Sequence, residues 1–238
     1  MDDLLQLKHL IQYDFACPDL LREAMTHRSY SAEKSLDYDN QRLEFLGDAV
    51  LEIILSEYLY RRYPDSPEGM LTKMRAALVQ QEALAGMARQ FQLDRFLRMG
   101  RGELESGGAQ REAALCDVFE ALTGAIYLDA GVARATKLIL PWFEQYFPDP
   151  EALVNNQNPK GALQELTQRR WNKAPEYQLI DVSGPDHDPH YRVAVCINGQ
   201  TLGNGEAGKR KTAESLAARD AIEKLTQSSL QSEEPDHD

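Results

Sequence analysis

Residues 43–63 read LEFLGDAVLEIILSEYLYRRY, and this stretch decides the fold class of the first part of the chain. Its apolar residues recur at spacings of three, four and one, which is the period of a helix with a buried face. The residues that follow this period are Leu43, Leu46, Val50, Ile53, Ile54 and Leu59. The stretch therefore predicts a long core helix.

The same period continues in the segments that follow this helix. It recurs in residues 70–91, 111–131 and 133–147. The proline-containing segment PDSPEG and the glycine-rich segment GRGELESGGAQ (100–110) interrupt the pattern as loops. Residues 1–147 are therefore expected to form one all-α domain.

The pattern changes after residue 157. Residues 148–157 contain prolines and asparagines and are the expected linker. Within residues 158–226, a helical segment precedes two segments that alternate at period two, an Asn-Gly hairpin turn, a third strand and a final helix. This order predicts a small α+β domain with the sequence α-β-β-β-α. Residues 227–238 are polar and acidic, and we expect a disordered tail there.

The net charge of −12 over 238 residues does not exclude nucleic-acid binding, because the acidity is uneven. Residues 158–226 hold ten Lys and Arg side chains against nine Asp and Glu, whereas residues 1–157 hold 16 against 25. With 42% hydrophobic and 27% charged residues, the composition is that of an ordinary globular protein.

The cysteines and the apolar runs indicate a compartment. Cys17, Cys116 and Cys196 are few and widely spaced, which fits reduced thiols and neither a disulfide framework nor a zinc site. No apolar run approaches the roughly 18 residues that cross a bilayer. The first residues, MDDLLQLKHLIQYDF, carry acids where a signal peptide has bases. We expect a cytoplasmic protein that does not contact a membrane.

Two pairs of acidic residues lie on predicted core helices. Glu44 and Asp48 are four residues apart, and Asp117 and Glu120 are three apart, so each pair lies on one helix face. Like charges in apolar surroundings are costly unless a cation compensates them. Two such pairs are what a divalent-cation site in a helix bundle requires, and oxygen ligands favour Mg²⁺ or Mn²⁺. Spacing alone leaves the alternative of solvated helix faces open.

The string NQRLEFLGDAVLE (40–52) resembles the ribonuclease III signature, N-E-R-L-E-F-L-G-D. Four further segments match the family in order and spacing. They are LREAMTHRSY (21–30), PEGMLTKMRAALV (67–79), GRGELESGG (100–108) and CDVFEALTGAIYLD (116–129). The resemblance covers nearly the whole chain, because the small domain resembles a double-stranded-RNA-binding domain.

This resemblance implies a Mg²⁺-dependent endoribonuclease, with Mn²⁺ as a substitute, that cuts double-stranded RNA and leaves 5′-phosphate and 3′-hydroxyl ends. It further implies a homodimer that processes ribosomal, messenger and transfer RNA precursors. By position, Asp48 and Glu120 would be catalytic, and Glu44, Asp117 and Glu120 would bind metal. The accessory positions and the dimer contact are Gln41, Glu68, Glu103 and Phe45.

One position departs from the family pattern. Gln41 stands where the signature has Glu, which removes one charge one turn before Glu44. An amide still accepts hydrogen bonds, so we expect activity to survive with a changed metal preference or efficiency. His27 is expected to pack or to cap a helix, since a metal-activated water needs no histidine base.

In the small domain, GKRKTAE (208–214) resembles the phosphate clamp of double-stranded-RNA-binding domains. Three bases at a helix start are unfavourable, because that end of the helix dipole is positive. A bound phosphate makes the arrangement favourable, since it attracts both the bases and the backbone N–H groups. The implied RNA contacts are Gln164, Glu165, His187, Lys209, Arg210 and Lys211. Trp171 and Tyr177 are expected to pack in the core, because a duplex keeps its own bases stacked.

A second hypothesis is a non-catalytic double-stranded-RNA-binding protein with a degenerate nuclease fold. Gln41 favours it, and the four intact carboxylates oppose it, because unpaired acids in apolar surroundings are costly without a metal. Mg²⁺-dependent cleavage of a duplex separates the two hypotheses.

Overall fold

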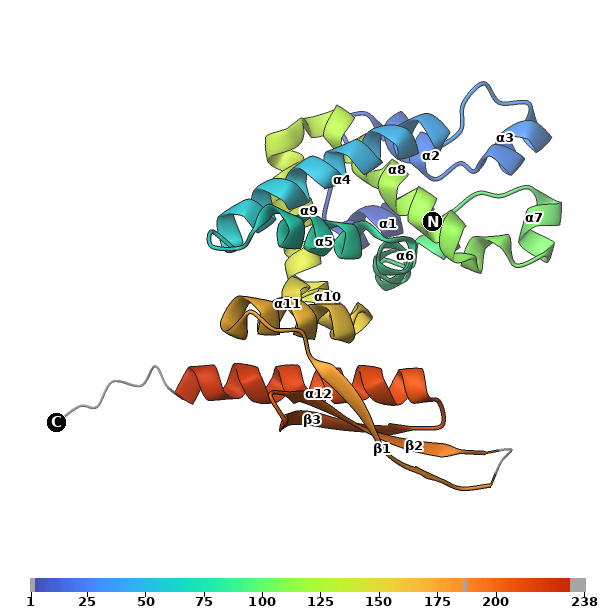
Figure 1. Ribbon diagram of the computed structural model, residues 1–238. Coiled ribbons are helices and arrows are strands. Elements are labelled where there is room, and N and C mark those ends of the chain that lie inside the picture. The colour runs from blue at the N-terminus through green and yellow to red at the C-terminus, as the bar shows by residue number, and fades with distance from the viewer. Residues whose placement is uncertain (1–2, 186–187, 232–238) are drawn as a thin grey trace. The chain divides into compact units, whose positions relative to one another are not determined.

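The computed structural model describes residues 3–185 and 188–231, which fall into two compact units that divide between Pro150 and Glu151. The first unit is helical, as predicted (Figure 1). Its α-helices are α1 (Asp3–Ile11), α2 (Pro18–Ala24), α3 (Arg28–Lys34), α4 (Gln41–Arg62), α5 (Glu68–Val79), α6 (Gln81–Gln90), α7 (Arg101–Glu105), α8 (Glu112–Ala130) and α9 (Val132–Tyr146). Two short 3₁₀ turns, η1 (Leu93–Arg95) and η2 (Gly108–Gln110), flank α7.

Helix α4 is the long helix that the apolar period predicts, and it packs across α8 in the middle of the first unit (Figure 1). Leu43, Val50 and Leu59 are buried in α4 as expected. Ile53 is not, because 58% of its surface is exposed. The period therefore identified the helix but gave it a wider buried face than it has.

Two glycines set the distance between α4 and α8. A Cβ atom at Gly47 would overlap the backbone oxygen of Glu120, and a Cβ atom at Gly124 would overlap the backbone oxygen of Leu43. No side chain therefore separates the two backbones where they cross. Helix α8 is buried on nearly every side from Ala114 to Ile126, so its crossing with α4 is the centre of the unit.

The second unit has the predicted α-β-β-β-α order, preceded by one more helix. Its elements are α10 (Pro150–Gln157), α11 (Pro159–Trp171), β1 (Glu176–Ser183), β2 (His190–Ile197), β3 (Gln200–Ala207) and α12 (Arg210–Gln231). The strands form an antiparallel sheet in the order β1-β2-β3. Asn198 and Gly199 both have positive φ, 51° and 76°, as the predicted two-residue hairpin turn requires.

The core of the second unit lies between the sheet and its helices. It is built from Leu163, Val193, Val195, Ala213, Ala217, Ala218 and Ala221. Gly203 and Gly205 of β3 face α12, where a Cβ atom at Gly203 would lie 2.5 Å from the backbone oxygen of Ala217. Small residues on both sides thus allow α12 to pack close to β3.

Three expectations for this unit need correction. Residues 227–231 continue α12 and are not a disordered tail, because no glycine or proline interrupts the sequence before Pro235; residues 232–238 lie outside the described part. The expected linker contains the helix α10. Trp171 is 41% exposed at the end of α11 and is not a core residue, whereas Tyr177 packs against the core.

No helix among the described residues combines the length and apolar character needed to cross a bilayer.

Gly47→Ala should destabilise the first unit strongly, because its methyl group requires α4 and α8 to move apart. We expect the free energy of unfolding to fall by about 3 kcal/mol or more, above the usual cost of overpacking, since the clash is with backbone. Chemical denaturation measures this loss.

Gly69→Ala is the matched control, because nothing lies within 4 Å of a Cβ atom at that helical position. Alanine favours helix over glycine, so this variant should be as stable as the parent or slightly more stable. Equal stability of Gly47→Ala and Gly69→Ala would contradict the close crossing.

Candidate active site

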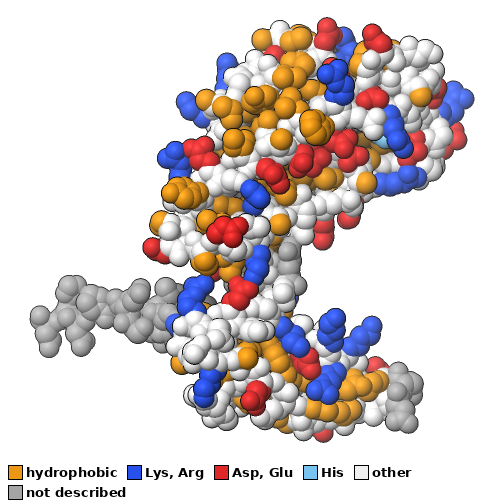
Figure 2. All heavy atoms as spheres, turned by 45° about the horizontal axis from the view of Figure 1, so that its top comes forward, with side chains coloured by type: hydrophobic (Ala, Val, Ile, Leu, Met, Phe, Trp, Pro, Cys, Tyr) orange, Lys and Arg blue, Asp and Glu red, His pale blue; other side chains and the backbone are white. Residues whose placement is uncertain are grey.

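The crossing of α4 and α8 brings the four predicted acids into one cluster. Glu44 and Asp48 come from α4, and Asp117 and Glu120 come from α8. Gly47 lies between the first two and packs on the backbone of Glu120, so the close approach of the helices places the two pairs together. Glu44, Asp117 and Glu120 are half-buried, whereas Asp48 is exposed. Acidic side chains border an exposed hydrophobic patch on this unit (Figure 2).

The four acids repel one another. Burial, followed by repulsion from Asp48, Glu44 and Asp117, raises the pKa of Glu120 to about 7. Burial also raises the pKa of Glu44, with repulsion from Asp117 adding to it. Burial raises the pKa of Asp117 too, although His27 and Arg28 oppose that shift. These shifts mean that the folded state favours a partly protonated cluster when no cation is bound.

The donor set fits a hard divalent cation. Among the described residues, none of the four carboxylates forms an ion pair with Lys or Arg, and the nearby His27 and Arg28 only partly offset the shift at Asp117. Carboxylate oxygens are the ligands that Mg²⁺ and Mn²⁺ prefer. Ligand atoms of Cys116, Asp117 and Glu120 all lie within 4.8 Å of one another. Glu44 and Asp48 are not part of this closely spaced group, although their charges act on Glu120.

Cys116 is a site residue that sequence reasoning missed. Its buried thiol donates to Oε1 of Glu120 with an Sγ–Oε1 distance of 3.7 Å. Burial and the neighbouring carboxylates raise the pKa of Cys116, so the thiol is neutral beside the acids. Its place next to Asp117 and four residues before Glu120 was the available signal, since a residue at that spacing shares a helix face with Glu120.

A hollow of about 620 Å³ opens beside Asp117 and contains another predicted residue, Glu103. Glu103 accepts a hydrogen bond from Arg111 there. His27 also lines the hollow, and its Nδ1 accepts from the backbone N–H of Ser29 at 3.3 Å, which caps α3. The capping role expected for His27 is therefore confirmed, and Arg28 is a cation near the cluster that the sequence did not single out.

Glu68 and Gln41 lie away from the centre of the cluster. Glu68 begins α5, accepts a hydrogen bond from Thr72 and lines a separate hollow of about 490 Å³. Gln41 is exposed in the first turn of α4, and its backbone N–H donates to Oδ1 of Asp39 at 3.0 Å. Asp39 also raises the pKa of Glu44. It is thus a nearby acid that the signature did not identify.

An apolar stripe runs along the exposed side of α4. Phe45 is 80% exposed, Ile53 58% and Tyr60 73%. Phe45 is therefore not a core residue, and it lies next to Glu44 on the helix. Large exposed apolar side chains in a row mark an interaction surface.

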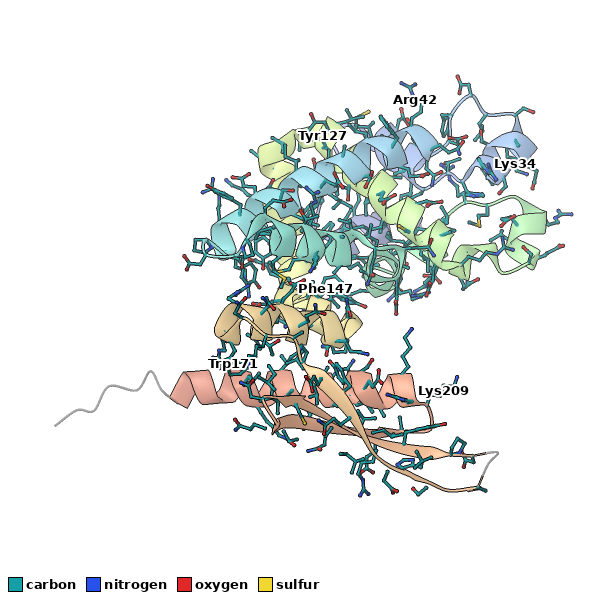
Figure 3. The ribbon with its side chains drawn as sticks, viewed as in Figure 1. Lys34, Arg42, Tyr127, Phe147, Trp171 and Lys209 are labelled. Carbon is teal, nitrogen blue, oxygen red and sulfur yellow. The ribbon has the colours of Figure 1, made fainter. Side chains whose placement is uncertain are left out.

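The second unit places its bases at the start of α12. Lys209 lies where the chain enters this helix, and Trp171 lies where it leaves α11 (Figure 3). Arg210 is already paired, because its Nε lies 3.1 Å from Oε1 of Glu214. The other carboxylate oxygen of Glu214, Oε2, lies 2.6 Å from Nζ of Lys160. In the described part of the unit, Lys209 and Lys211 are exposed and form no ion pair. The three bases are therefore not equivalent.

The remaining predicted RNA contacts are on α11 and in the β1–β2 loop. Gln164 and Glu165 are exposed in the first half of α11, whose N-terminus carries Lys160. Lys160 lies 4.5 Å from the centre of the Tyr177 ring, which helps to hold this end of the helix against the sheet. His187 lies outside the described residues.

Comparison with known proteins gives two family matches. Residues 18–146 match the Ribonuclease-III-like family, and residues 159–225 match the double-stranded RNA binding motif. The chain is 43% identical over 224 residues to Ribonuclease 3 of Streptococcus pneumoniae serotype 19F (strain G54), covering 92% of this chain and 94% of that protein.

Two solved structures of the nuclease domain of ribonuclease III from Campylobacter jejuni are similar to the first unit. One is 38% identical, with a TM-score of 0.59, and covers 63% of this chain and 99% of that chain. The other concerns structural flexibility in the region involved in dimer formation; it is 39% identical, with a TM-score of 0.58, and covers 60% of this chain and 98% of that chain.

Glu120→Gln should stabilise the metal-free protein at pH 8. A carboxyl whose pKa is raised on folding binds more protons in the folded state, so its contribution to stability is lost as pH rises from about 4.5 to about 7. The amide mimics the protonated form. After allowance for solvent screening, we expect a gain of about 1–2 kcal/mol at pH 8 that disappears near pH 5.

Thermal unfolding in a chelator at both pH values measures this difference. Glu82→Gln is the control, because Glu82 is an exposed acid on α6 of the same unit. It should give no comparable gain at pH 8. A less stable Glu120→Gln protein at pH 8 would show that the acids do not repel one another in the folded state.

Proposed function

The chain belongs to the ribonuclease III family and is an endoribonuclease that acts on double-stranded RNA, and we propose that Glu44, Asp117 and Glu120 hold Mg²⁺, or Mn²⁺ as a substitute, at its active site. The observation that supports this site is the half-buried cluster of carboxylates that has no cationic partner in the described part of the chain. The retention of all four acids also favours an enzyme over a non-catalytic RNA-binding protein.

The chemistry is hydrolysis of a phosphodiester. A bound divalent cation lowers the pKa of water and neutralises charge on the phosphate. Asp48 is the most exposed of the four acids, so we assign it the role of accepting a hydrogen bond from the attacking water and orienting it. The water oxygen bonds to phosphorus, the bond to the 3′ oxygen breaks, and a proton passes to that oxygen. The products carry 5′-phosphate and 3′-hydroxyl ends.

Gln41 adjusts this site by lowering its charge. A glutamate at its position would lie one turn before Glu44, whose pKa is already raised by burial and by Asp117. An amide adds no further repulsion to Glu44 and still accepts a hydrogen bond. Glu103, which lines the same hollow as Asp117, and Glu68, which lines a separate hollow on α5, are accessory acids linked to the site or its substrate.

The apolar stripe of α4 supports a homodimer. Phe45, Ile53 and Tyr60 are too exposed to stabilise a monomer, and burial against a second copy removes their apolar surface from water. A two-fold dimer carries two carboxylate clusters, one for each RNA strand. Phe45 adjoins Glu44, so the dimer surface and the active site meet on one helix.

The second unit binds the duplex. Lys209 and Lys211, with Arg210, contact phosphates at the start of α12, and Gln164 and Glu165 of α11 reach a minor groove. Such contacts recognise the shape of the duplex and its 2′-hydroxyls. His187 is proposed as a further groove contact from the β1–β2 loop. The cellular substrates are ribosomal, messenger and transfer RNA precursors in the cytoplasm, where the three free cysteines remain reduced.

Asp48→Asn should abolish cleavage while leaving RNA binding intact. The change removes one charge from the exposed edge of the cluster and touches nothing in the second unit. We expect the cleavage rate to fall by about 10²-fold or more and binding measured with Ca²⁺ to change less than about twofold. Glu52→Gln, an exposed acid one turn further along α4, is the control and should cleave normally. Cleavage at the parent rate by Asp48→Asn would remove Asp48 from the mechanism.

The salt dependence of duplex binding should distinguish the three bases of the clamp. Lys209→Ala and Lys211→Ala should each lower the slope of log K against log salt by about 0.9, the value for one phosphate of a B-form duplex. Arg210→Ala should lower it less, because Glu214 already pairs with that guanidinium. Binding titrations at several salt concentrations measure the slopes, and a larger loss for Arg210→Ala than for the lysines would contradict this assignment.

A further inference from the structure

The carboxylate cluster contains a thiol that hydrolysis of RNA does not use. Cys116 is buried, its Sγ lies 3.7 Å from Oε1 of Glu120, and the ligand atoms of Cys116, Asp117 and Glu120 fall within 4.8 Å of one another. The other cysteines are elsewhere, because Cys17 is exposed at the start of α2 and Cys196 belongs to the second unit.

The spacing of these atoms suits a small tetrahedral cation. In such a site, zinc lies about 2.3 Å from sulfur and about 2.1 Å from a carboxylate oxygen, which places the two ligand atoms about 3.6 Å apart. The Sγ–Oε1 distance of 3.7 Å matches that separation before any side chain rotates. Asp117 follows Cys116 directly, and rotation of its carboxylate provides a third ligand.

The types of ligand atom decide which cation binds this group of residues most strongly. Mg²⁺ takes hard oxygen ligands in an octahedron and gains nothing from a thiol, whereas Zn²⁺ and Cd²⁺ bind thiolate strongly. We propose that Cys116, Asp117 and Glu120 form a binding site for thiophilic divalent cations, Zn²⁺ or Cd²⁺, within the Mg²⁺ site. The inference rests on the proposed metal site, of which it uses two carboxylates.

Binding is a simple exchange. The cation forms bonds to Sγ of Cys116 and to one carboxylate oxygen each of Asp117 and Glu120, and the S–H proton leaves to solvent. Nothing is oxidised or reduced. The thiophilic cation would thus bind Asp117 and Glu120, two of the three ligands proposed for Mg²⁺, with a water as its fourth ligand, so zinc should inhibit the nuclease at concentrations far below those of magnesium.

Cd²⁺ titration of the metal-free, full-length protein tests the site without measuring activity. Thiolate–cadmium bonds absorb in the ultraviolet, and this band should appear in the parent protein and in the controls Cys17→Ala and Cys196→Ala. It should be absent from Cys116→Ala and Cys116→Ser. Competition should show that Zn²⁺ affinity, relative to Mn²⁺ affinity, falls about tenfold or more in both Cys116 variants. An unchanged band in these variants, or none in the parent, would overturn the proposal.

X-ray absorption at the zinc edge keeps the test independent of whether the variants fold. The parent protein loaded with one Zn²⁺ should show a sulfur neighbour at about 2.3 Å. Oxygen and nitrogen neighbours alone would refute sulfur ligation. A sulfur neighbour together with no Mg²⁺-dependent cleavage would instead contradict the proposed nuclease site and leave the thiophilic site standing.

Discussion

The close crossing of α4 and α8 at Gly47 and Gly124 is the constraint on which the first unit depends. Both glycines face the backbone of the opposite helix, so the helices meet without intervening side chains. Glu44 and Asp48 flank Gly47, and Glu120 supplies the backbone oxygen that Gly47 approaches. One packing contact therefore brings together acids that are 69 to 76 residues apart in sequence. A larger residue at the crossing would separate the acids as well as loosen the core.

This contact assembles a site that opposes folding electrostatically. Burial, followed by repulsion from the neighbouring carboxylates, raises the pKa of Glu120 to about 7, so the fully ionised cluster is unfavourable at neutral pH without a cation. The surrounding core supplies the compensation, because α8 is buried on nearly every side next to the cluster. Local instability of this kind is typical of functional sites that rigid packing holds in place. A cation that binds the cluster only in the folded state would stabilise the fold by the same linkage.

The sequence predicted the elements better than it predicted their environment. The period of residues 43–63 located α4, and the spacing of the acids placed each pair on one helix face, because both depend only on helix geometry. That the two pairs belong to one site was implied by the family resemblance and not by the spacing. The exposure of Ile53, the pairing of Arg210 with Glu214 and the contact of Cys116 with Glu120 were not predicted. Each of these features depends on which residue of the folded chain lies opposite the side chain, or on whether any residue lies there. That information arises from tertiary packing and from rotamers, which a single sequence does not specify.

Acidic and basic side chains are distributed unequally between the two units of the chain. Residues 1–157 carry 25 acids against 16 bases, so this part of the chain repels an RNA polyanion overall. Residues 158–226 are close to neutral and present Lys209 and Lys211 at a helix start, where the backbone N–H groups also attract phosphate. A cation at the proposed metal site would reduce the repulsion between these acids and the phosphates of a duplex. The acidity of the first unit therefore makes the exposed bases of the second unit, together with the proposed cation, the main sources of attraction for the RNA phosphates.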